Sequence, residues 1–494
     1  MAKGKPSLDC LIHQLSSESD LRSELNADRF TNYNTTLMNN KITPLGTCTA
    51  SSLHSDDMAC LIKALEGLND NDLFSIDTVS RLWKDIRYDF YNLLGLDERK
   101  HNVVFVPSGT DSETLISSVI LEKDGSEKLH NVVVAPLEVG SGTELACGGR
   151  AFSERSPDGS SWEIGDSIIP SVSNKTSVHG VEVRSSSGNI PPMSQMEDDI
   201  EEIINNSISH DLSVSVHIVA GSKTGVHAPS IEFIQNIEEL NYPKLHVLVD
   251  AAQGRFSRTG VRKSLEAGRI VTITGSKFFG APPFCGAVIF PKTKYPEIRW
   301  REEYEPLFNQ MCFEHHIPNQ SYTVRNGVLL RWIIGISNMK TYYSTDPKMR
   351  LKVLKWFEED GVKAINENRS LRYIEPQFFS PDEKNRLLAT NKTIHTFQVS
   401  SNGRNLGLKE LKIIHSRLID KNNMSGKSIG QPVLLSRLTE ESGLRIALGS
   451  KLIVDTISSI SSGLNEASAR EGLFALLSET CSEISRIAED FDEN

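Results

Sequence analysis

Two short stretches decide the fold: Val247-Leu-Val-Asp250-Ala-Ala-Gln253 and Thr272-Ile-Thr-Gly-Ser-Lys277-Phe-Phe-Gly280. Each opens on apolar or β-branched residues, which favour an extended strand. Each then reaches a charged side chain, Asp250 in the first stretch and Lys277 in the second. Together they predict two strands that present an acid and a lysine where the strands end.

Further apolar runs surround these two stretches. The predicted strands cover 103–106, 131–135, 212–219, 245–249, 270–274 and 286–290, and segments 196–206 and 230–240 have helical spacing. Mostly apolar strands separated by helices favour a mostly parallel sheet that is covered on both faces. We therefore predict an α/β fold, a three-layer sandwich with a mostly parallel central sheet, whose ligands bind at the carboxyl ends of the strands.

The rest of the chain suggests four parts. We predict an N-terminal helical arm at 1–100, a large domain at 101–320, a connecting long helix at 321–350 and a smaller C-terminal α/β domain at 351–494. Within the arm, 81–96 has helical periodicity, while 33–52 has no clear period and predicts an ordered loop. Strands are predicted at 394–399 and 444–448, and a last helix near 465–490.

Composition narrows the class of protein. The 494 residues carry a net charge of −11, which gives no reason to expect nucleic acid or an anionic membrane as a partner. The seven cysteines are scattered and form no C-x-x-C pair, so a disulfide framework is disfavoured and a reducing, cytoplasmic location is expected. No signal-peptide pattern opens the chain, and no apolar run of about 20 residues predicts a membrane span.

The Asp250–Lys277 pair indicates pyridoxal 5'-phosphate (PLP). In PLP sites a lysine forms a Schiff base with the cofactor and an acid pairs with the pyridine nitrogen. Phe278, Phe279 and Pro282 surround the lysine with apolar groups, and burial favours the neutral amine. Taken alone, Lys277 could be a loop lysine and Asp250 a capping residue, but the two together favour the cofactor.

Other polar residues at strand ends are candidates for the cofactor's remaining groups. Ser108, Gly109 and Thr110 follow a strand and open a helix, a place that suits a phosphate, although Ser-Gly-Thr is also an ordinary helix cap. Thr274 is a second phosphate candidate, and Gln253 and Ser222 could reach the ring hydroxyl. Each of these residues is, by itself, an unremarkable strand-end polar group.

Arg445 lies in a short predicted strand, and its guanidinium could hold a substrate carboxylate. The alternative is a surface arginine on a half-buried strand. The string Cys312-Phe-Glu-His315-His316 has no zinc spacing, so no metal site is predicted.

Together these residues resemble the fold-type I PLP-dependent enzymes, and within them the class V aminotransferase and cysteine desulfurase group. The Asp250-Ala-Ala-Gln253 string matches that group closely, whereas Thr274-Gly-Ser-Lys277 is a looser match to its Ser-x-His-Lys. The resemblance implies that Asp250 binds the ring nitrogen, Gln253 and Ser222 the ring oxygen, and Lys277 the aldehyde carbon. It also implies a homodimer with the site at the subunit interface, where Thr323 would reach a neighbour's phosphate.

The chain departs from this group in two places. The family stacks a histidine or an aromatic residue on the cofactor ring, but the segment 137–143 contains neither. A desulfurase needs a nucleophilic cysteine on a C-terminal loop, and no cysteine occurs between Cys312 and Cys481. The second departure disfavours cysteine desulfurase.

The sequence therefore predicts a PLP-dependent enzyme that acts on an amino acid or amine through an external aldimine, with aminotransferase as the first hypothesis. A PLP lyase or decarboxylase on the same fold is the alternative. A non-catalytic protein that keeps the fold for binding is a third, which the intact Asp250–Lys277 pair disfavours.

Overall fold

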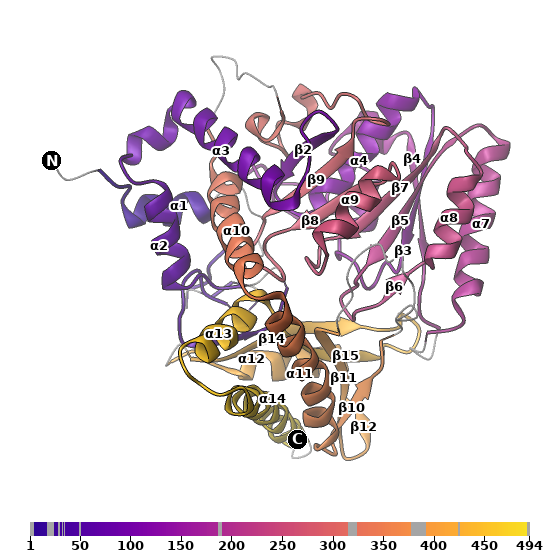
Figure 1. Ribbon diagram of the computed structural model, residues 1–494. Coiled ribbons are helices and arrows are strands. Elements are labelled where there is room, and N and C mark those ends of the chain that lie inside the picture. The colour runs from indigo at the N-terminus through magenta and orange to yellow at the C-terminus, as the bar shows by residue number, and fades with distance from the viewer. Residues whose placement is uncertain are drawn as a thin grey trace.

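The computed structural model describes residues 4–16, 24–27, 30–31, 33, 35–48, 51–185, 190–314, 324–376, 392–422 and 425–491. Two sheets with their covering helices form an upper and a lower layer in Figure 1. The candidate site residues come from the edge at which these two layers meet.

The upper sheet is the predicted parallel sheet. Its strands are β2 (His101–Val106), β3 (Leu129–Val134), β4 (Thr176–Val181), β5 (Ser213–Ala220), β6 (His227–Ala228), β7 (Leu245–Ala251), β8 (Ile270–Thr274) and β9 (Gly286–Pro291). Their order is β2-β9-β8-β7-β5-β3-β4, with β6 paired to β5. Strands β4, β3, β5, β7 and β8 run parallel, and β9 is antiparallel to both β8 and β2.

Helices cover both faces of this sheet, which explains why its strands other than β4 are almost wholly buried. Helix α4 (Gly109–Asp124) packs on one face together with α5 (Thr143–Cys147) and α6 (Pro170–Ser173). The opposite face carries α7 (Met193–Ser209), α8 (Ile231–Glu239) and α9 (Arg258–Glu266) (Figure 1). The predicted fold class is confirmed, and all six predicted strands are present within a few residues of their expected ends.

Strand β4 was not predicted, and the reason is physical. It lies at one edge of the sheet and pairs only with β3. Five of its six residues are partly or fully exposed, so its sequence needs no continuous apolar run.

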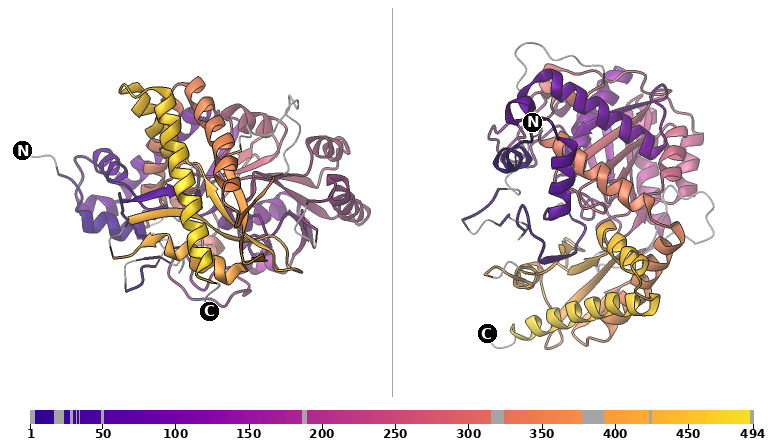
Figure 2. Two further views of the ribbon diagram at one scale, coloured as in Figure 1. Left: turned by 90° about the horizontal axis from the view of Figure 1, so that it is seen from below. Right: turned by 60° about the vertical axis from the view of Figure 1, so that its left-hand side comes forward.

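The lower sheet contains the C-terminal strands. They are β10 (Leu371–Ile374), β11 (Ile394–Ser401), β12 (Arg404–Asn405), β13 (Ile419–Asp420), β14 (Ser425–Leu434) and β15 (Ser442–Ala447). Helices α11 (Pro347–Asn366), α12 (Leu408–Arg417), α13 (Ser450–Ser461) and α14 (Glu466–Glu489) belong to the same layer. Helices α11 and α14 lie side by side across this sheet in the left view of Figure 2.

The N-terminal part of the chain joins both layers. Helices α1 (Leu8–Ser16), α2 (Ser55–Ala64) and α3 (Ile76–Leu94) pack against the long helix α10 (Gly327–Ser344). Between α1 and α2, strand β1 (Ile42–Leu45) pairs in parallel with β14 of the lower sheet. The segment that was predicted to be a loop of the N-terminal arm is therefore partly a strand, and it belongs to the C-terminal sheet.

All seven cysteines are free thiols. In the described part of the chain, no helix combines the length and the apolar character that crossing a membrane requires.

Candidate functional site

A cavity of about 390 Å³ opens at the carboxyl ends of the parallel strands. Residues from the upper sheet, the lower sheet and the N-terminal segment all line it. The predicted site residues on its wall are Ser108, Gly109, Thr110, Asp250, Gln253, Thr274, Lys277 and Arg445. The fold therefore brings eight candidates, which span more than 300 positions of the chain, to one cavity.

Lys277 follows β8 in a turn and is only partly exposed. Its amine has no hydrogen-bond partner among the described residues. Burial lowers the pKa of the Lys277 amine, and the neighbouring Arg445 and Arg255 lower it further, against the opposing effect of Asp250. The result is a lysine with more neutral amine than a lysine in water has, which is the form that attacks a carbonyl.

Asp250 lies in the neighbouring strand β7, next to Thr272 of β8 in the register of the two strands. One of its carboxylate oxygens, Oδ1, accepts a hydrogen bond of 2.9 Å from the backbone N–H of Ala252. No described residue donates to the other oxygen. Asp250 thus presents a fixed carboxylate with one free acceptor on the cavity wall.

The turn before α4 offers hydrogen-bond donors. Ser108 is the N-cap of α4, and its Oγ accepts from the N–H of Asp111 at 3.1 Å and donates to the Asp111 carboxylate at 2.5 Å. The serine hydroxyl is therefore used within the turn. The N–H groups of Gly109 and Thr110, at the start of the helix, remain as donors toward the cavity.

Thr274 lines the cavity, but its hydroxyl donates to the carbonyl of Ala252 at 2.6 Å. That bond ties the ends of β7 and β8 together and uses the only proton of the hydroxyl. Ser276, two residues further on, also lines the cavity, and its hydroxyl has no partner among the described residues. Ser276 is thus better suited than Thr274 to donate to an anion, and the sequence reasoning missed it.

Arg445 extends from β15 of the lower sheet into the cavity wall. Its Nε and Nη2 donate to the carbonyl of Gln431 at 2.9 and 2.7 Å, and Nη1 donates to the carbonyl of Lys223 at 3.1 Å. A guanidinium has five N–H groups, so two remain without a partner in the described structure. Burial lowers the pKa of Arg445, but a guanidinium remains charged at neutral pH.

Gln253 is buried on the cavity wall, where its Oε1 accepts from Arg255 at 3.2 Å. Ser222 lies elsewhere. Its hydroxyl donates to Glu138, and it is not part of the cavity wall. The structure therefore does not bring Ser222 to the cavity with the other candidates.

Glu138 explains the position of Ser222. The buried carboxylate pairs with Arg184 and accepts from the hydroxyls of Ser222 and Thr224. Burial raises the pKa of Glu138, but Arg184 and the two hydroxyls lower it by more, so the carboxylate stays ionised. A buried charge needs partners of this kind, and the network fixes the turn that follows β3.

That turn supplies Pro136 and Leu137 to the cavity wall and no aromatic residue. Two aromatic residues reach the described cavity wall from elsewhere, namely Tyr33 and Phe284. Cys48 reaches it from the segment after β1, and Lys412, Gln431 and Arg437 from the lower sheet and its helix. No local pattern marks these residues, because only the packing of the two layers makes them neighbours.

Of the string Cys312–His316, the structure describes Cys312, Phe313 and Glu314. Glu314 accepts a hydrogen bond from the hydroxyl of Tyr91, and the carbonyl of Cys312 accepts from Arg87. His315, His316 and Thr323 lie outside the described residues.

No family model and no curated protein matches the chain. Its fold is similar to that of solved structures. Mouse CSAD in its apo form matches with a TM-score of 0.51 and 12% identity, over 90% of this chain and 84% of that chain. Oryza sativa TDC with PLP and tryptamine matches with a TM-score of 0.50 and 11% identity, over 92% and 85%. The chain thus shares its α/β fold with these two structures.

Proposed function

We propose that the protein is a PLP-dependent enzyme that acts on an amino acid or another amine. The observation that carries this proposal is the pairing of Lys277, with its lowered pKa, and Asp250 at the ends of adjacent strands on one cavity wall. The likeness of the fold is consistent with it, and so is the Asp250-Ala-Ala-Gln253 string, on which the narrower class V assignment rests.

The residues fit the cofactor group by group. The free oxygen of Asp250 would hold the proton of the pyridine nitrogen, and Gln253 would face the ring hydroxyl. The N–H groups of Gly109 and Thr110, with the hydroxyl of Ser276, would hold the phosphate. When bound, PLP supplies an aldehyde that condenses with amines and a ring that accepts electrons from a bond broken at the substrate's α-carbon.

Lys277 and Arg445 would then handle the substrate. The two unpartnered N–H groups of Arg445 suit a carboxylate, which a guanidinium can bind through two parallel hydrogen bonds. Lys277, with its lowered pKa, would act as the base that takes the proton from the α-carbon. Proton transfer by Lys277 favours an aminotransferase as the first hypothesis.

A PLP decarboxylase or lyase is the second candidate. The observation behind it is that a structure with a similar fold, Oryza sativa TDC, holds PLP together with tryptamine, an amine without a carboxylate. Which bond of the α-carbon breaks depends on its angle to the cofactor ring, so the products must decide between the two reactions.

The first experiment compares the near-visible absorbance of the purified protein with that of Lys277→Ala after PLP is added to both. The proposal expects the wild type to show an absorbance band from PLP bound to Lys277. Borohydride reduction should then attach the cofactor covalently to the peptide that contains Lys277. No such adduct should form in the variant. Lys340→Ala, which removes an exposed lysine paired with Asp89, is the control and should behave as the wild type.

A wild type without the band after PLP is added would contradict the proposal. If the band forms, amino acids are screened for spectral change and for products. A keto acid indicates transamination, and carbon dioxide indicates decarboxylation. Binding without turnover of any amine would favour a non-catalytic protein. The homodimer with a shared site and the cytoplasmic location also remain part of this proposal.

A further inference from the structure

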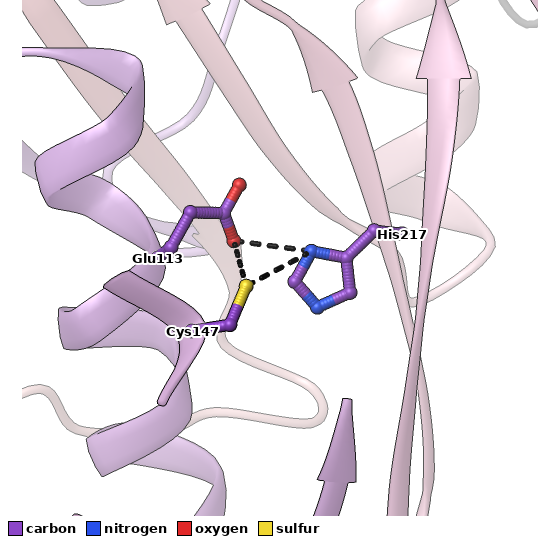
Figure 3. Close-up of side chains that lie close together, drawn as sticks. All are labelled: Glu113, Cys147 and His217. Atoms are coloured by element: carbon purple, nitrogen blue, oxygen red, sulfur yellow. Dashed lines mark hydrogen bonds and ion pairs between the residues drawn. The ribbon is translucent and has the colours of Figure 1, made fainter. Parts of the chain in front are cut away.

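Three potential metal ligands meet in the interior, away from the cavity wall. Glu113 comes from α4, Cys147 from the end of α5 and His217 from the middle of β5 (Figure 3). All three are buried, with exposed fractions of 2%, 0% and 3%. Their side chains point toward one another, and none of the three belongs to the PLP site described above.

The distances between the three ligand atoms suit a metal ion. Glu113 Oε2 lies 3.1 Å from His217 Nδ1 and 3.6 Å from Cys147 Sγ, and Sγ lies 3.8 Å from Nδ1. A point equidistant from three atoms so spaced is about 2.0 Å from each. Zinc bonds to nitrogen and oxygen at about 2.0–2.1 Å and to sulfur at about 2.3 Å, so a zinc ion near the plane of the three atoms reaches all of them.

Asn131 fixes the histidine for this role. Its amide nitrogen donates to Ser117 Oγ at 3.2 Å and to the carbonyl of Cys147 at 3.0 Å. The amide oxygen of Asn131 therefore faces His217 Nε2, at 3.4 Å, and accepts a hydrogen bond from its N–H. A neutral ring of this tautomer turns the lone pair of Nδ1 toward Glu113 and Cys147. Such an outer partner is typical of a metal-binding histidine.

This arrangement is unfavourable without a positive charge. In the described structure the buried Glu113 carboxylate contacts the His217 imidazole and the Cys147 thiol, and a buried carboxylate without strong donors is costly. A bound cation would offset the buried negative charge of this carboxylate. A thiolate, an imidazole and a carboxylate together are a ligand set that zinc accepts.

We propose that Glu113, Cys147 and His217 bind one divalent transition-metal ion of the zinc type, with a structural role. The ion would tie α4 and α5 to β5. Helix α4 begins at the turn Ser108–Thr110, and α5 follows the turn of Pro136 and Leu137. The ion would thereby hold two turns of the cavity wall against the sheet. The proposal does not depend on PLP chemistry, and it reverses the sequence-based expectation of no metal.

The test measures the metal content of the full-length protein, expressed with added zinc and purified without chelator. We expect about one zinc ion per chain in the wild type and at least a tenfold lower content in Cys147→Ser and in His217→Asn. Cys481→Ser is the matched control, because Cys481 is equally buried but lies in α14. It should keep the wild-type content.

A second measurement does not depend on the variants folding. Wild-type protein expressed with cobalt should show thiolate-to-cobalt charge-transfer absorbance. This absorbance is measured as the difference from the spectrum of the zinc form, because PLP contributes equally to both spectra. A wild type without stoichiometric metal after zinc supplementation would overturn the proposal and leave only the direct contact between His217 and Glu113. Metal that persists in both folded ligand variants would also overturn it, because the ion would then be bound elsewhere.

Discussion

At the residue scale, the site depends on which hydrogen-bonding groups the protein has already used. The hydroxyl groups of Ser108 and Thr274 already donate hydrogen bonds within the protein. In the described structure, the hydroxyl of Ser276 and one carboxylate oxygen of Asp250 have no hydrogen-bond partner. Arg445 has three of its five N–H groups on backbone carbonyls, which hold the guanidinium in place. A side chain fixed in this way binds a ligand with little further loss of conformational freedom.

Replacing Arg445 tests its proposed role. Arg445→Gln should raise the KM for a carboxylate-bearing substrate on the order of 10- to 100-fold, because a hydrogen bond to a charged group contributes about 1.5–3 kcal/mol. The KM of Arg445→Lys should lie between those of the wild type and Arg445→Gln, since lysine keeps the charge but lacks the planar guanidinium. Steady-state kinetics on the substrate found by the screen measures both variants.

The cofactor band should stay unchanged in both Arg445 variants. Arg417→Gln is the control, because Arg417 pairs with the exposed Asp490 on the surface and should leave KM unaltered. An unchanged KM in Arg445→Gln would make the arginine structural, or the substrate a simple amine.

At the scale of single elements, the short strand β1 is the least expected feature. It pairs with β14 and leads directly to Thr47 and Cys48, of which Cys48 lines the cavity. Gly46 follows β1, and a Cβ at this position would lie 2.7 Å from the backbone oxygen of Ile429. Only a glycine allows the N-terminal segment to approach β14 so closely.

Gly46→Ala should therefore separate the segment from the lower sheet and displace Cys48. We expect the free energy of unfolding to fall by about 1–3 kcal/mol, because overpacking of a tight site destabilises a protein by this amount. We also expect faster proteolysis before residue 55. Urea denaturation and limited proteolysis measure the two effects.

The matched control is Gly472→Ala in α14, where an added Cβ meets nothing within 4 Å. That variant should be neutral or more stable by about 0.5–1 kcal/mol, because alanine favours a helix. Equal stability of the two variants would contradict the close approach of β1 to β14.

At the scale of the whole molecule, the cavity exists because two sheets and the N-terminal segment meet at one edge. This packing removes Lys277 from water and lowers the pKa of its amine. Burial of a titratable group also makes the free energy of unfolding depend on pH, because the folded and unfolded chains then bind different numbers of protons.

The stability of the PLP-free protein should consequently depend on pH through Lys277. In the unfolded chain the pKa of the lysine is about 10.4, and in the folded chain the pKa of Lys277 is lower. Between the two pKa values the unfolded chain binds more protons, so the free energy of unfolding rises with pH. Lys277→Met lacks this rise and should be more stable than the wild type at pH 7, by a margin that shrinks toward pH ~10.4.

Urea denaturation of both proteins between pH 7 and pH ~10.4 checks this slope. Lys340→Met, at an exposed lysine, should run parallel to the wild type. Parallel curves for Lys277→Met as well would mean that Lys277 is not buried in solution.

The sequence by itself determined the features that depend on neighbours along the chain. Apolar runs predicted the strands, the helices between them predicted a mostly parallel sheet, and parallel strands align their carboxyl ends at one edge. Asp250 and Lys277 could be recognised together for this reason, since Asp250 lies at the end of β7 and Lys277 follows β8.

Only the tertiary structure decided what depends on distant contacts. It placed β1 in the C-terminal sheet, brought Cys48 to the cavity, directed Ser222 to Glu138 and assembled Glu113, Cys147 and His217. These neighbours share no sequence spacing, because packing between separate elements brings them together. A local sequence pattern shows the periodicity of one helix or strand, but it does not show which other element packs against it.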